Sequence, residues 1–297
     1  MLAMRWAIRR RVPYLLWGDS NMRTLAASGP MSPFKDTVLR YFCRHAAGAL
    51  TIGTENEQFW SYYGIEPERQ FRSPLAVDNH LFATGANRIR QQKTMHRQRL
   101  GLPPGRLLLY VGRLAPAKNL DSLLQALAAL RRGGDPSLSI AVVGDGPEKS
   151  RLQRLVRRLD LPGVFWFGFQ RLDELPAFYG VADALVLPSL YEPWGLVVNE
   201  AMASGLPVLV SRTAGCRPDL VEEGWNGWSF DPSSRDSIVS CLRAFTRLSD
   251  EQLETMGARS EQRISGWDYR TALAGIHRAL QAVAPRSRAA APAASPV

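Results

Sequence analysis

The segment YEPWGLVVNEAMASGLPV, residues 191–208, decides the fold of this chain. It follows an apolar run typical of a buried strand, turns at Pro193 and Gly195, continues as a helix and enters a second apolar strand. Glu192 precedes the helix and Glu200 lies within it. A helix N-terminus presents unpaired N–H groups and a partial positive charge, which suit a phosphate, and adjacent carboxylates accept hydrogen bonds from hydroxyls. The segment therefore indicates a nucleotide or sugar-nucleotide site.

Strand-like and helix-like segments alternate from about residue 106 onward. The apolar runs predict strands at residues 107–111, 138–143, 164–167, 184–187 and 207–211. The intervening patterns predict helices at residues 120–130, 148–159 and 174–179, and another directly after Gly195. Successive parallel strands need crossover helices, so the pattern predicts an α/β fold with a doubly wound parallel sheet covered on both faces.

Four segments follow predicted strands directly, at residues 112–113, 144–146, 168–169 and 189–195. Ligands of doubly wound sheets bind beyond the carboxyl ends of the strands, so these segments should meet at one edge. The Gly-Asp-Gly-Pro turn at residues 144–147 does not by itself distinguish a phosphate-binding turn from an ordinary tight turn between strand and helix. The convergence of the four segments is the stronger signal.

The beginning of the chain is less regular. It predicts strands at residues 13–17 and 49–53, helices at 35–46 and 55–63, and an extended piece at 74–78. We therefore expect a partial N-terminal α/β domain over residues 1–86, a basic, Gln-rich linker at 87–105, and the main domain at 106–284. Residues 285–297, rich in Ala, Pro, Ser and Arg, are expected to be a disordered tail.

The formal net charge of +10 suits phosphate-bearing substrates, nucleic acid or an anionic membrane surface. The basic clusters at residues 88–99 and 151–158 are interleaved with apolar and amide positions, which is typical of solvated helix faces. No zinc-finger spacing or aromatic RNA-binding signature accompanies them, so we expect no nucleic-acid partner.

The three cysteines, Cys43, Cys216 and Cys241, are far apart and outside any Cys-x-x-Cys pattern, so we expect neither a disulfide framework nor a metal site. No apolar run reaches the ~18 residues of a membrane span. We expect a cytoplasmic protein, although Trp6, Ile8 and Leu15, beside the arginines at residues 9–11, could contact the inner face of a membrane as a peripheral protein.

Three motifs together resemble the donor-binding domain of GT-B glycosyltransferases of family 4, also called glycosyl transferases group 1. They are residues 111–114 with 118–120, residues 143–147, and the pair Glu192 and Glu200, which seven residues separate as in that family. The resemblance covers residues 107–282 and implies a GT-B fold, in which the last helix, at about 269–283, crosses back to the N-terminal domain. It implies transfer of a sugar from a nucleoside-diphosphate sugar to a hydroxyl acceptor, with retention and without metal or cofactor.

The resemblance also assigns site residues. Arg113 and Lys118 match the basic pair that binds the donor diphosphate and offsets the charge that develops as the nucleoside diphosphate departs. Glu192 matches the position that contacts the transferred sugar, and Glu200 the one that binds ribose hydroxyls. The remaining nucleotide-binding positions, which act mainly through backbone atoms, are Gly112, Gly144, Gly168, Phe169, Gln170, Gly195, Leu196 and Val197.

The N-terminal part resembles the family less closely. Asp19 lies in the turn at residues 17–20, where many members carry a His-containing turn near the acceptor, so it is a candidate polar group at the reacting face. It could equally cap the next segment. Nothing before Trp17 resembles the strand and Gly-rich loop with which the family's first domain normally begins, so we expect that domain to be incomplete. Two functions stay open, a glycosyltransferase and a binding module that holds a sugar nucleotide without transferring its sugar.

Overall fold

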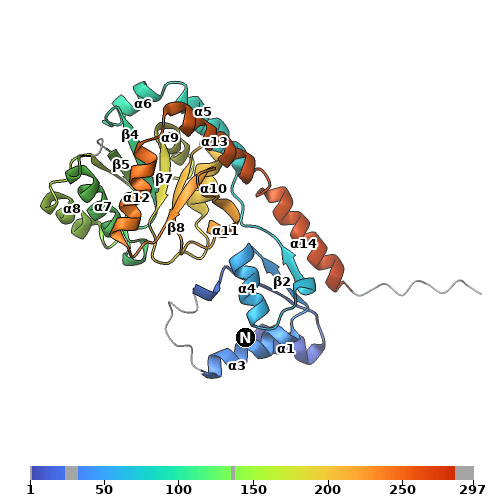
Figure 1. Cartoon of the computed structure of the whole chain (residues 1–297). Helices are drawn as coiled ribbons and strands as arrows, with labels where there is room; N and C mark the ends of the chain where they lie inside the picture. The colour runs from blue at the N-terminus through green and yellow to red at the C-terminus, as the bar shows by residue number, and fades with distance from the viewer. Residues whose placement is uncertain (1, 24–32, 135–137, 285–297) are drawn as a thin grey trace, which may run out of the picture.

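The computed structural model describes residues 2–23, 33–134 and 138–284, which form a large lobe and a small lobe (Figure 1). The large lobe comprises strands β4 to β9 with helices α5 to α13, and the small lobe comprises β1 to β3 with α1, α3 and α4. The tail predicted at residues 285–297 lies outside the described residues.

The large lobe is built on a six-stranded sheet in which all pairings are parallel. Its order is β6-β5-β4-β7-β8-β9, so the chain winds outward from β4 in one direction, returns to pair β7 with β4, and winds outward in the other. This confirms the doubly wound sheet. The strands are β4 (Arg106–Val111), β5 (Leu138–Val143), β6 (Val164–Gly168), β7 (Ala184–Leu187), β8 (Val208–Ser211) and β9 (Gly227–Phe230).

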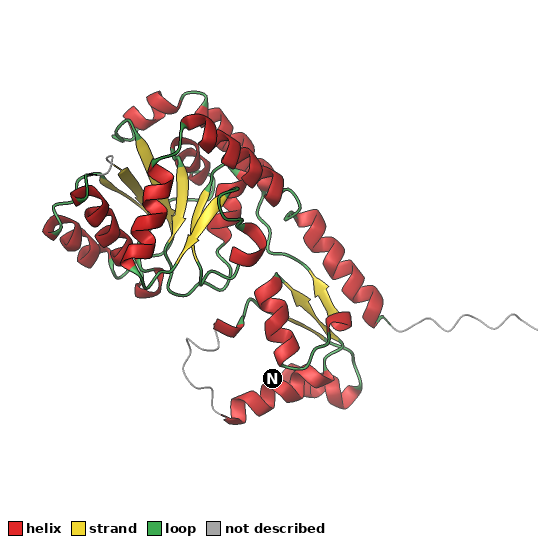
Figure 2. Cartoon of the chain, in the orientation of Figure 1, coloured by secondary structure: helices red, strands yellow, loops and turns green. Residues whose placement is uncertain are grey.

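Helices cover both faces of this sheet (Figure 2). Alternate residues of β4 serve two separate cores, because side chains along a strand point to opposite faces. Leu107 and Leu109 belong to one buried cluster, and Leu108 and Tyr110 belong to the other. The first cluster includes residues of α5 (Asn79–Arg90), α9 (Leu175–Val181) and α10 (Leu196–Ala203); the second includes residues of α7 (Leu120–Arg132), α8 (Lys149–Arg158) and α12 (Arg235–Thr246).

The stretch expected to be a linker, residues 87–105, is mostly helical and packs on the large lobe. It contains the end of α5 and all of α6 (Lys93–Arg99). Arg97, expected on a solvated helix face, is only 8% exposed, because its guanidinium pairs with Asp183 at 2.9 Å and donates to the carbonyl oxygen of Val181 at 2.8 Å. The sequence suggested a solvated stretch, because the acidic and carbonyl partners of its basic residues lie far away in the sequence.

The small lobe has a three-stranded parallel sheet in the order β1-β2-β3 among its described residues. Its strands are β1 (Leu15–Trp17), β2 (Gly48–Thr51) and β3 (Gln70–Arg72), and its helices are α1 (Leu2–Arg10), α3 (Pro33–His45) and α4 (Thr54–Tyr62). The extended piece predicted at 74–78 is not a strand, and β3 lies just before it. The sequence did not predict β3, because its three residues are only half-buried and two of them are polar.

The last helices connect the two lobes. Helix α13 (Asp250–Ile264) packs on α10 in the large lobe, and α14 (Tyr269–Val283) then runs across to the small lobe, where it contacts β3 (Figure 1). Ser73, directly after β3, donates a hydrogen bond from Oγ to the carbonyl oxygen of Ala272 at 3.0 Å. The end of the chain that is described therefore belongs structurally to both lobes.

Candidate functional site

The loops that follow β4 to β8 meet at the carboxyl edge of the large sheet. The change in winding direction lies between β4 and β7, which are paired neighbours although β5 and β6 lie between them in the sequence. Ligands of such sheets bind in the crevice at this switch point. The loop after β4 carries Arg113 and Lys118, and the loop between β7 and α10 carries Glu192 and Gly195. The four predicted segments therefore lie at one edge of the sheet, and two of them, the loops after β4 and β7, flank the switch point.

The glycines after β4 and β5 bring two loop backbones into contact. A Cβ atom on Gly144 would lie 1.9 Å from the carbonyl oxygen of Gly112, and Gly144 has a φ of 138°, which disfavours other residues. Its N–H donates to the carbonyl oxygen of Gly168 at 2.7 Å. The three predicted strand-end glycines thus lie in adjacent loops, and backbone packing alone is sufficient to require glycine at position 144.

Arg113 is an exposed cation at this edge. Its carbonyl oxygen accepts a hydrogen bond from the hydroxyl of buried Tyr110 at 3.0 Å, which fixes the backbone of the loop. None of the ion pairs found in residues 2–23, 33–134 and 138–284 involves its guanidinium. Arg113 is therefore available to bind an anion beyond the end of β4.

Lys118 and Glu192 are brought together from the loops after β4 and β7. Lys118 Nζ lies 2.5 Å from Glu192 Oε2, which also accepts a hydrogen bond from Ser189 Oγ at 3.1 Å. Asn119, in the left-handed conformation with φ 54°, holds Lys118 in place through hydrogen bonds from its Nδ2 to the carbonyl oxygens of Pro188 and Pro232. The two predicted site residues therefore neutralise each other in the free protein.

Helix α10 begins at the same point. Gly195, with φ 101°, lets the chain turn sharply from the β7–α10 loop into the helix. The N–H groups of Leu196 and Val197 are in the first turn, where no carbonyl of the same helix is available to them. Leu196 is 40% exposed, so this first turn faces solvent. The end of α10 can therefore receive an anion next to Lys118 and Glu192.

Glu200 lies one turn further along α10 and interacts with α9. The hydroxyl of Tyr179 donates a hydrogen bond to Glu200 Oε2 at 2.6 Å. Burial raises the pKa of Glu200 to about 7, and the hydrogen bond from Tyr179 opposes this rise. The carboxylate is thus held in a partly desolvated position, where a hydrogen bond from a ligand hydroxyl would be strengthened.

Gly168, Phe169 and Gln170 lie at the end of β6, on the far side of β5 from the switch point. Phe169 is 77% exposed, whereas Gln170 donates from Nε2 to the carbonyl oxygen of Phe167 at 2.8 Å. The structure places these residues at the same edge of the sheet as the other site residues, with the loop after β5 between them and the loop after β4.

Asp19 lies on the small lobe and faces the β7–α10 loop. Its charge, together with that of Glu192, adds to the effect of burial in raising the pKa of Tyr191. Nearby, Asn21 Nδ2 donates to the carbonyl oxygen of Pro193 at 3.2 Å. Asp19 is exposed, and no hydrogen bond or ion pair between its side chain and Arg113, Lys118 or Glu192 is present in the described residues. Asp19 therefore lies on the small lobe, opposite the β7–α10 loop, and makes no described side-chain contact with the predicted cations and Glu192 of the large lobe.

Four residues that support the site were given no role in the sequence analysis, although Asn119 and Ser189 lie in the segments that it singled out: Tyr179, Ser189, Asn119 and Asn21. Ser189 could have been found, because it lies two positions after the predicted strand and precedes Glu192 by three positions. Tyr179 is separated from Glu200 by 21 positions and lies on another helix, so only the packing of α9 beside α10 reveals its role.

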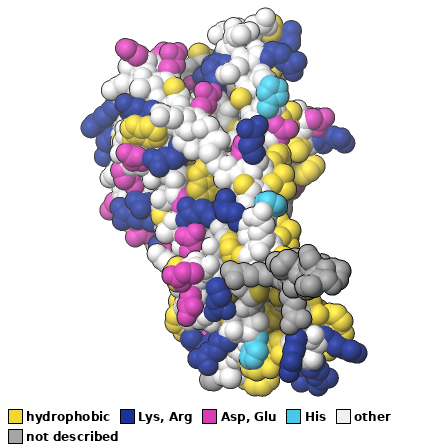
Figure 3. Space-filling model, turned by 90° about the vertical axis from the view of Figure 1, so that its right-hand side faces the viewer, with side chains coloured by type: hydrophobic (Ala, Val, Ile, Leu, Met, Phe, Trp, Pro, Cys, Tyr) yellow, Lys and Arg dark blue, Asp and Glu magenta, His cyan; other side chains and the backbone are white. Residues whose placement is uncertain are grey.

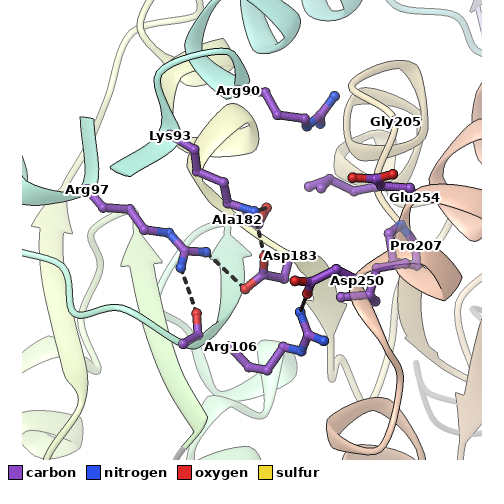
Figure 4. A pocket seen from close by; sticks show the side chains of 13 residues that line it. Arg90, Lys93, Arg97, Arg106, Ala182, Asp183, Gly205, Pro207, Asp250 and Glu254 are labelled. Carbon is purple, nitrogen blue, oxygen red and sulfur yellow. Dashed lines mark hydrogen bonds and ion pairs between the residues drawn. The ribbon is translucent and has the colours of Figure 1, made fainter. Parts of the chain in front are cut away.

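A cavity of about 540 Å³ lies at the opposite, amino edge of the same sheet (Figure 4). Its charged groups are largely paired with one another: Lys93 and Arg97 with Asp183, and Arg106 with Asp250. Asp183 also accepts from the backbone N–H of Leu107 at 2.6 Å. These pairs attach α6 and α13 to the ends of the strands, so the cavity is part of the support of the lobe.

No group of three or more His, Cys, Asp or Glu side chains in residues 2–23, 33–134 and 138–284 is arranged to hold a metal ion. Across the same residues, no helix combines the length and the apolar character needed to cross a bilayer.

Comparisons with known proteins agree with this architecture. The chain is 37% identical over 193 residues to the sulfoquinovosyl transferase SQD2 of Arabidopsis thaliana, covering 64% of this chain and 36% of the relative. It is 35% identical over 239 residues to a D-inositol 3-phosphate glycosyltransferase of Thermomonospora curvata, covering 75% of this chain and 54% of the relative. The chain thus spans between a third and about half of the length of these curated relatives.

Solved structures show the same fold. HepE of Anabaena, in complex with UDP and glucose, superposes with a TM-score of 0.76 at 22% identity, covering 94% of this chain and 74% of that one. The architecture is that of GT-B glycosyltransferases. The family model described as glycosyl transferases group 1 matches residues 92–263, which include every predicted site residue except Asp19. The chain therefore belongs to the glycosyl transferases group 1 family.

Proposed function

We propose that this chain transfers a sugar from a nucleoside-diphosphate sugar to a hydroxyl acceptor. The observation that carries the proposal is the meeting of three features at the switch point: the Lys118–Glu192 pair, the open first turn of α10, and Glu200 one turn further on. A cation and a helix N-terminus suit a diphosphate, whereas two carboxylates on either side suit the hydroxyls of a sugar and a ribose. The family membership of the chain supports this assignment.

In the proposed complex, the donor diphosphate lies on the N–H groups of Leu196 and Val197 and pairs with Arg113 and Lys118. These charges would stabilise the nucleoside diphosphate as it leaves, so the proposed transfer needs no metal ion or cofactor for that step. Retention at the anomeric carbon is proposed from the resemblance to the family alone. Binding of the diphosphate by Lys118 would release Glu192 to contact the transferred sugar.

The other contacts follow from the positions of the loops. Glu200 would bind the ribose, and the backbone of Gly112, Gly144 and residues 168–170 would surround the base and phosphates. Asp19 would face the acceptor from the small lobe. HepE, which shares this fold, was solved with UDP and glucose, and this supports a nucleotide sugar as the donor.

The alternative function is a module that binds a sugar nucleotide without transferring its sugar. Calorimetry with UDP, GDP and ADP, run beside a turnover assay that detects nucleotide released from the corresponding sugar nucleotides, separates the two. We expect one nucleotide to bind and its sugar nucleotide to be consumed, with glycans and lipids tested as acceptors. Binding without turnover would favour the module, and absence of binding by all three nucleotides would contradict both functions.

We also propose a peripheral contact with the cytoplasmic face of an anionic membrane, through α1 and α3 of the small lobe. These helices line a cavity of about 590 Å³ and expose Leu2 (85%), Trp6 (57%) and Phe34 (76%). Arg5 and Arg9 line the same cavity. Figure 3 shows dark blue and yellow side chains side by side at this lower end of the molecule. Basic residues around exposed apolar side chains are typical of surfaces that insert into the headgroup region of anionic bilayers.

Co-sedimentation with vesicles tests this contact. The protein is expected to bind vesicles that contain phosphatidylglycerol and to bind phosphatidylcholine vesicles much more weakly. Replacing Trp6 and Phe34 together by serine should abolish binding, whereas Leu273→Ser, which removes an equally exposed apolar side chain from α14, should not. Equal binding to both kinds of vesicle, or binding unaffected by the double substitution, would rule out this surface.

A further inference from the structure

The two oxygens of the Glu200 carboxylate have different environments. Oε2 accepts the hydrogen bond of 2.6 Å from the Tyr179 hydroxyl, whereas no donor to Oε1 is present in the described part of the chain. Tyr179 is fully buried, and Glu200 is partly exposed. One oxygen is therefore fixed by a side chain of α9, and the other is left without a donor among the described residues.

Tyr179 is itself held rigidly, because α9 packs closely on α5. The ring of Phe82 on α5 meets the ring of Tyr179 edge to face, with centroids 5.6 Å apart and an interplanar angle of 83°. Next to Tyr179, Gly180 allows the close approach: a Cβ atom there would lie 2.6 Å from Cβ of Ile89 and 2.7 Å from the carbonyl oxygen of Ala86. The hydroxyl of Tyr179 therefore has a fixed position from which to donate to Glu200.

We propose that Tyr179 is a positioning residue for nucleotide binding, whose hydroxyl orients the Glu200 carboxylate so that its free oxygen accepts hydrogen bonds from the ribose hydroxyls. This inference rests on the proposed function of the site and extends it to a residue on another helix. A hydrogen bond to an ionised carboxylate is stronger than one between neutral groups, so Tyr179 also favours the ionised form of Glu200. The ionised form is the better acceptor for the ribose.

The electrostatic surroundings of Glu200 are simple. Burial raises its pKa to about 7, and the hydrogen bond from Tyr179 lowers it. Burial keeps Tyr179 protonated, because it raises the pKa of that hydroxyl well above its ordinary value. Arg90 of α5 interacts with Glu261, Asp183 and Glu254, and Arg263 of α13 pairs with Glu222. Strands β7 and β8 contain no charged residue.

The test compares wild-type protein with Tyr179→Phe, which keeps the ring and removes the hydroxyl. In the nucleotide-free proteins, the Glu200 carboxyl is titrated by ¹³C NMR, with Glu200→Gln used to assign its signal. Loss of the hydrogen bond should raise the pKa of Glu200 by about one unit. Binding of whichever of UDP, GDP and ADP the wild type prefers should then weaken at every pH, because the carboxylate loses its orientation, and the loss should be about fivefold larger near pH 7 than near pH 9, where Glu200 is ionised in both proteins.

Tyr63→Phe is the matched control, because it removes the hydroxyl of another buried tyrosine in the small lobe, away from the site. It should shift neither the Glu200 titration nor the pH profile of binding. A purely structural effect of Tyr179→Phe would weaken binding equally at all pH values, and that result, or an unshifted Glu200 titration, would overturn the inference. If the wild type bound none of the three nucleotides, the proposed function itself would fail, whatever the titration showed.

Discussion

At the scale of single residues, the two cations of the site differ in their partners. Lys118 is paired with Glu192 at 2.5 Å, whereas Arg113 is exposed and takes part in no ion pair of the described chain. Removing Lys118 would leave a buried carboxylate without its cation, so its effects on folding and on function would be mixed. Removing Arg113 disturbs no such pair and isolates the contribution of a charge to the reaction.

Arg113→Ala is therefore predicted to lower kcat by roughly 10² to 10³, the scale expected when a group that stabilises developing charge is lost. The reason is that the departing diphosphate would lose one of its two cations. The measurement is steady-state turnover of the sugar nucleotide that the wild type prefers. Arg132→Ala, at the far end of α7, is the control for removal of an exposed arginine and should leave kcat unchanged. A wild-type kcat in Arg113→Ala would reject the proposed role.

At the scale of secondary-structure elements, what could be predicted depended on the length and burial of each segment. β4 and β5 are six-residue strands with five buried positions each, so their apolar runs are unmistakable in the sequence. β3 and β9 have three and four residues, are partly exposed and include Gln, Arg, Gly and Ser, so they lack the apolar run by which the equally short β1, β7 and β8 were predicted. Helix α1 was not predicted either; its apolar and basic residues were considered only as a membrane contact.

The same limit applies to the site. Glu192, Gly195 and Glu200 belong to one continuous segment, so the sequence alone indicates that they lie together. The pairing of Lys118 with Glu192 could not be predicted in this way, because the two residues follow different strands, β4 and β7. These strands are neighbours only because the sheet changes winding direction between them. The hydrogen bond from Tyr179 to Glu200 depends on how α9 and α10 are rotated relative to each other, and tertiary packing determines that rotation. Local pattern predicts which residues carry the chemistry, and packing determines which of them meet.

At the scale of the whole molecule, the small lobe is attached to the β7–α10 loop and to the short helix α11 (Arg217–Leu220). Asp219 of α11 accepts hydrogen bonds from the backbone N–H of Thr54 at 2.9 Å and from its hydroxyl at 2.7 Å. Arg72 Nη1 lies 3.5 Å from the same carboxylate. A side chain of the large lobe thus caps the N-terminus of α4 in the small lobe.

The β7–α10 loop takes part in the same interface. The Trp194 ring stacks on Trp267, just before α14, with centroids 5.1 Å apart, and Trp194 Nε1 donates to Asn199 Oδ1 at 3.0 Å. Asn199 Nδ2 in turn donates to the carbonyl oxygen of Leu75, after β3. The loop that carries Glu192 therefore contacts the segment before α14 directly, and the segment after β3 through Asn199.

Asp219→Ala is predicted to loosen the small lobe while leaving the nucleotide site in place. Loss of the cap should destabilise the start of α4 by about 2 kcal/mol and accelerate amide hydrogen exchange there roughly 30-fold. Because the predicted nucleotide contacts lie on the large lobe, the Kd of the preferred nucleotide should change little, whereas kcat should fall as the acceptor side loses its fixed position.

Asp78→Ala is the matched control: Asp78 caps α5 by accepting from the N–H of Leu81 at 2.9 Å, without crossing between lobes. It should accelerate exchange in α5 alone, and equal exchange in α4 for Asp219→Ala and the wild type would show that this carboxylate does not hold the lobes together.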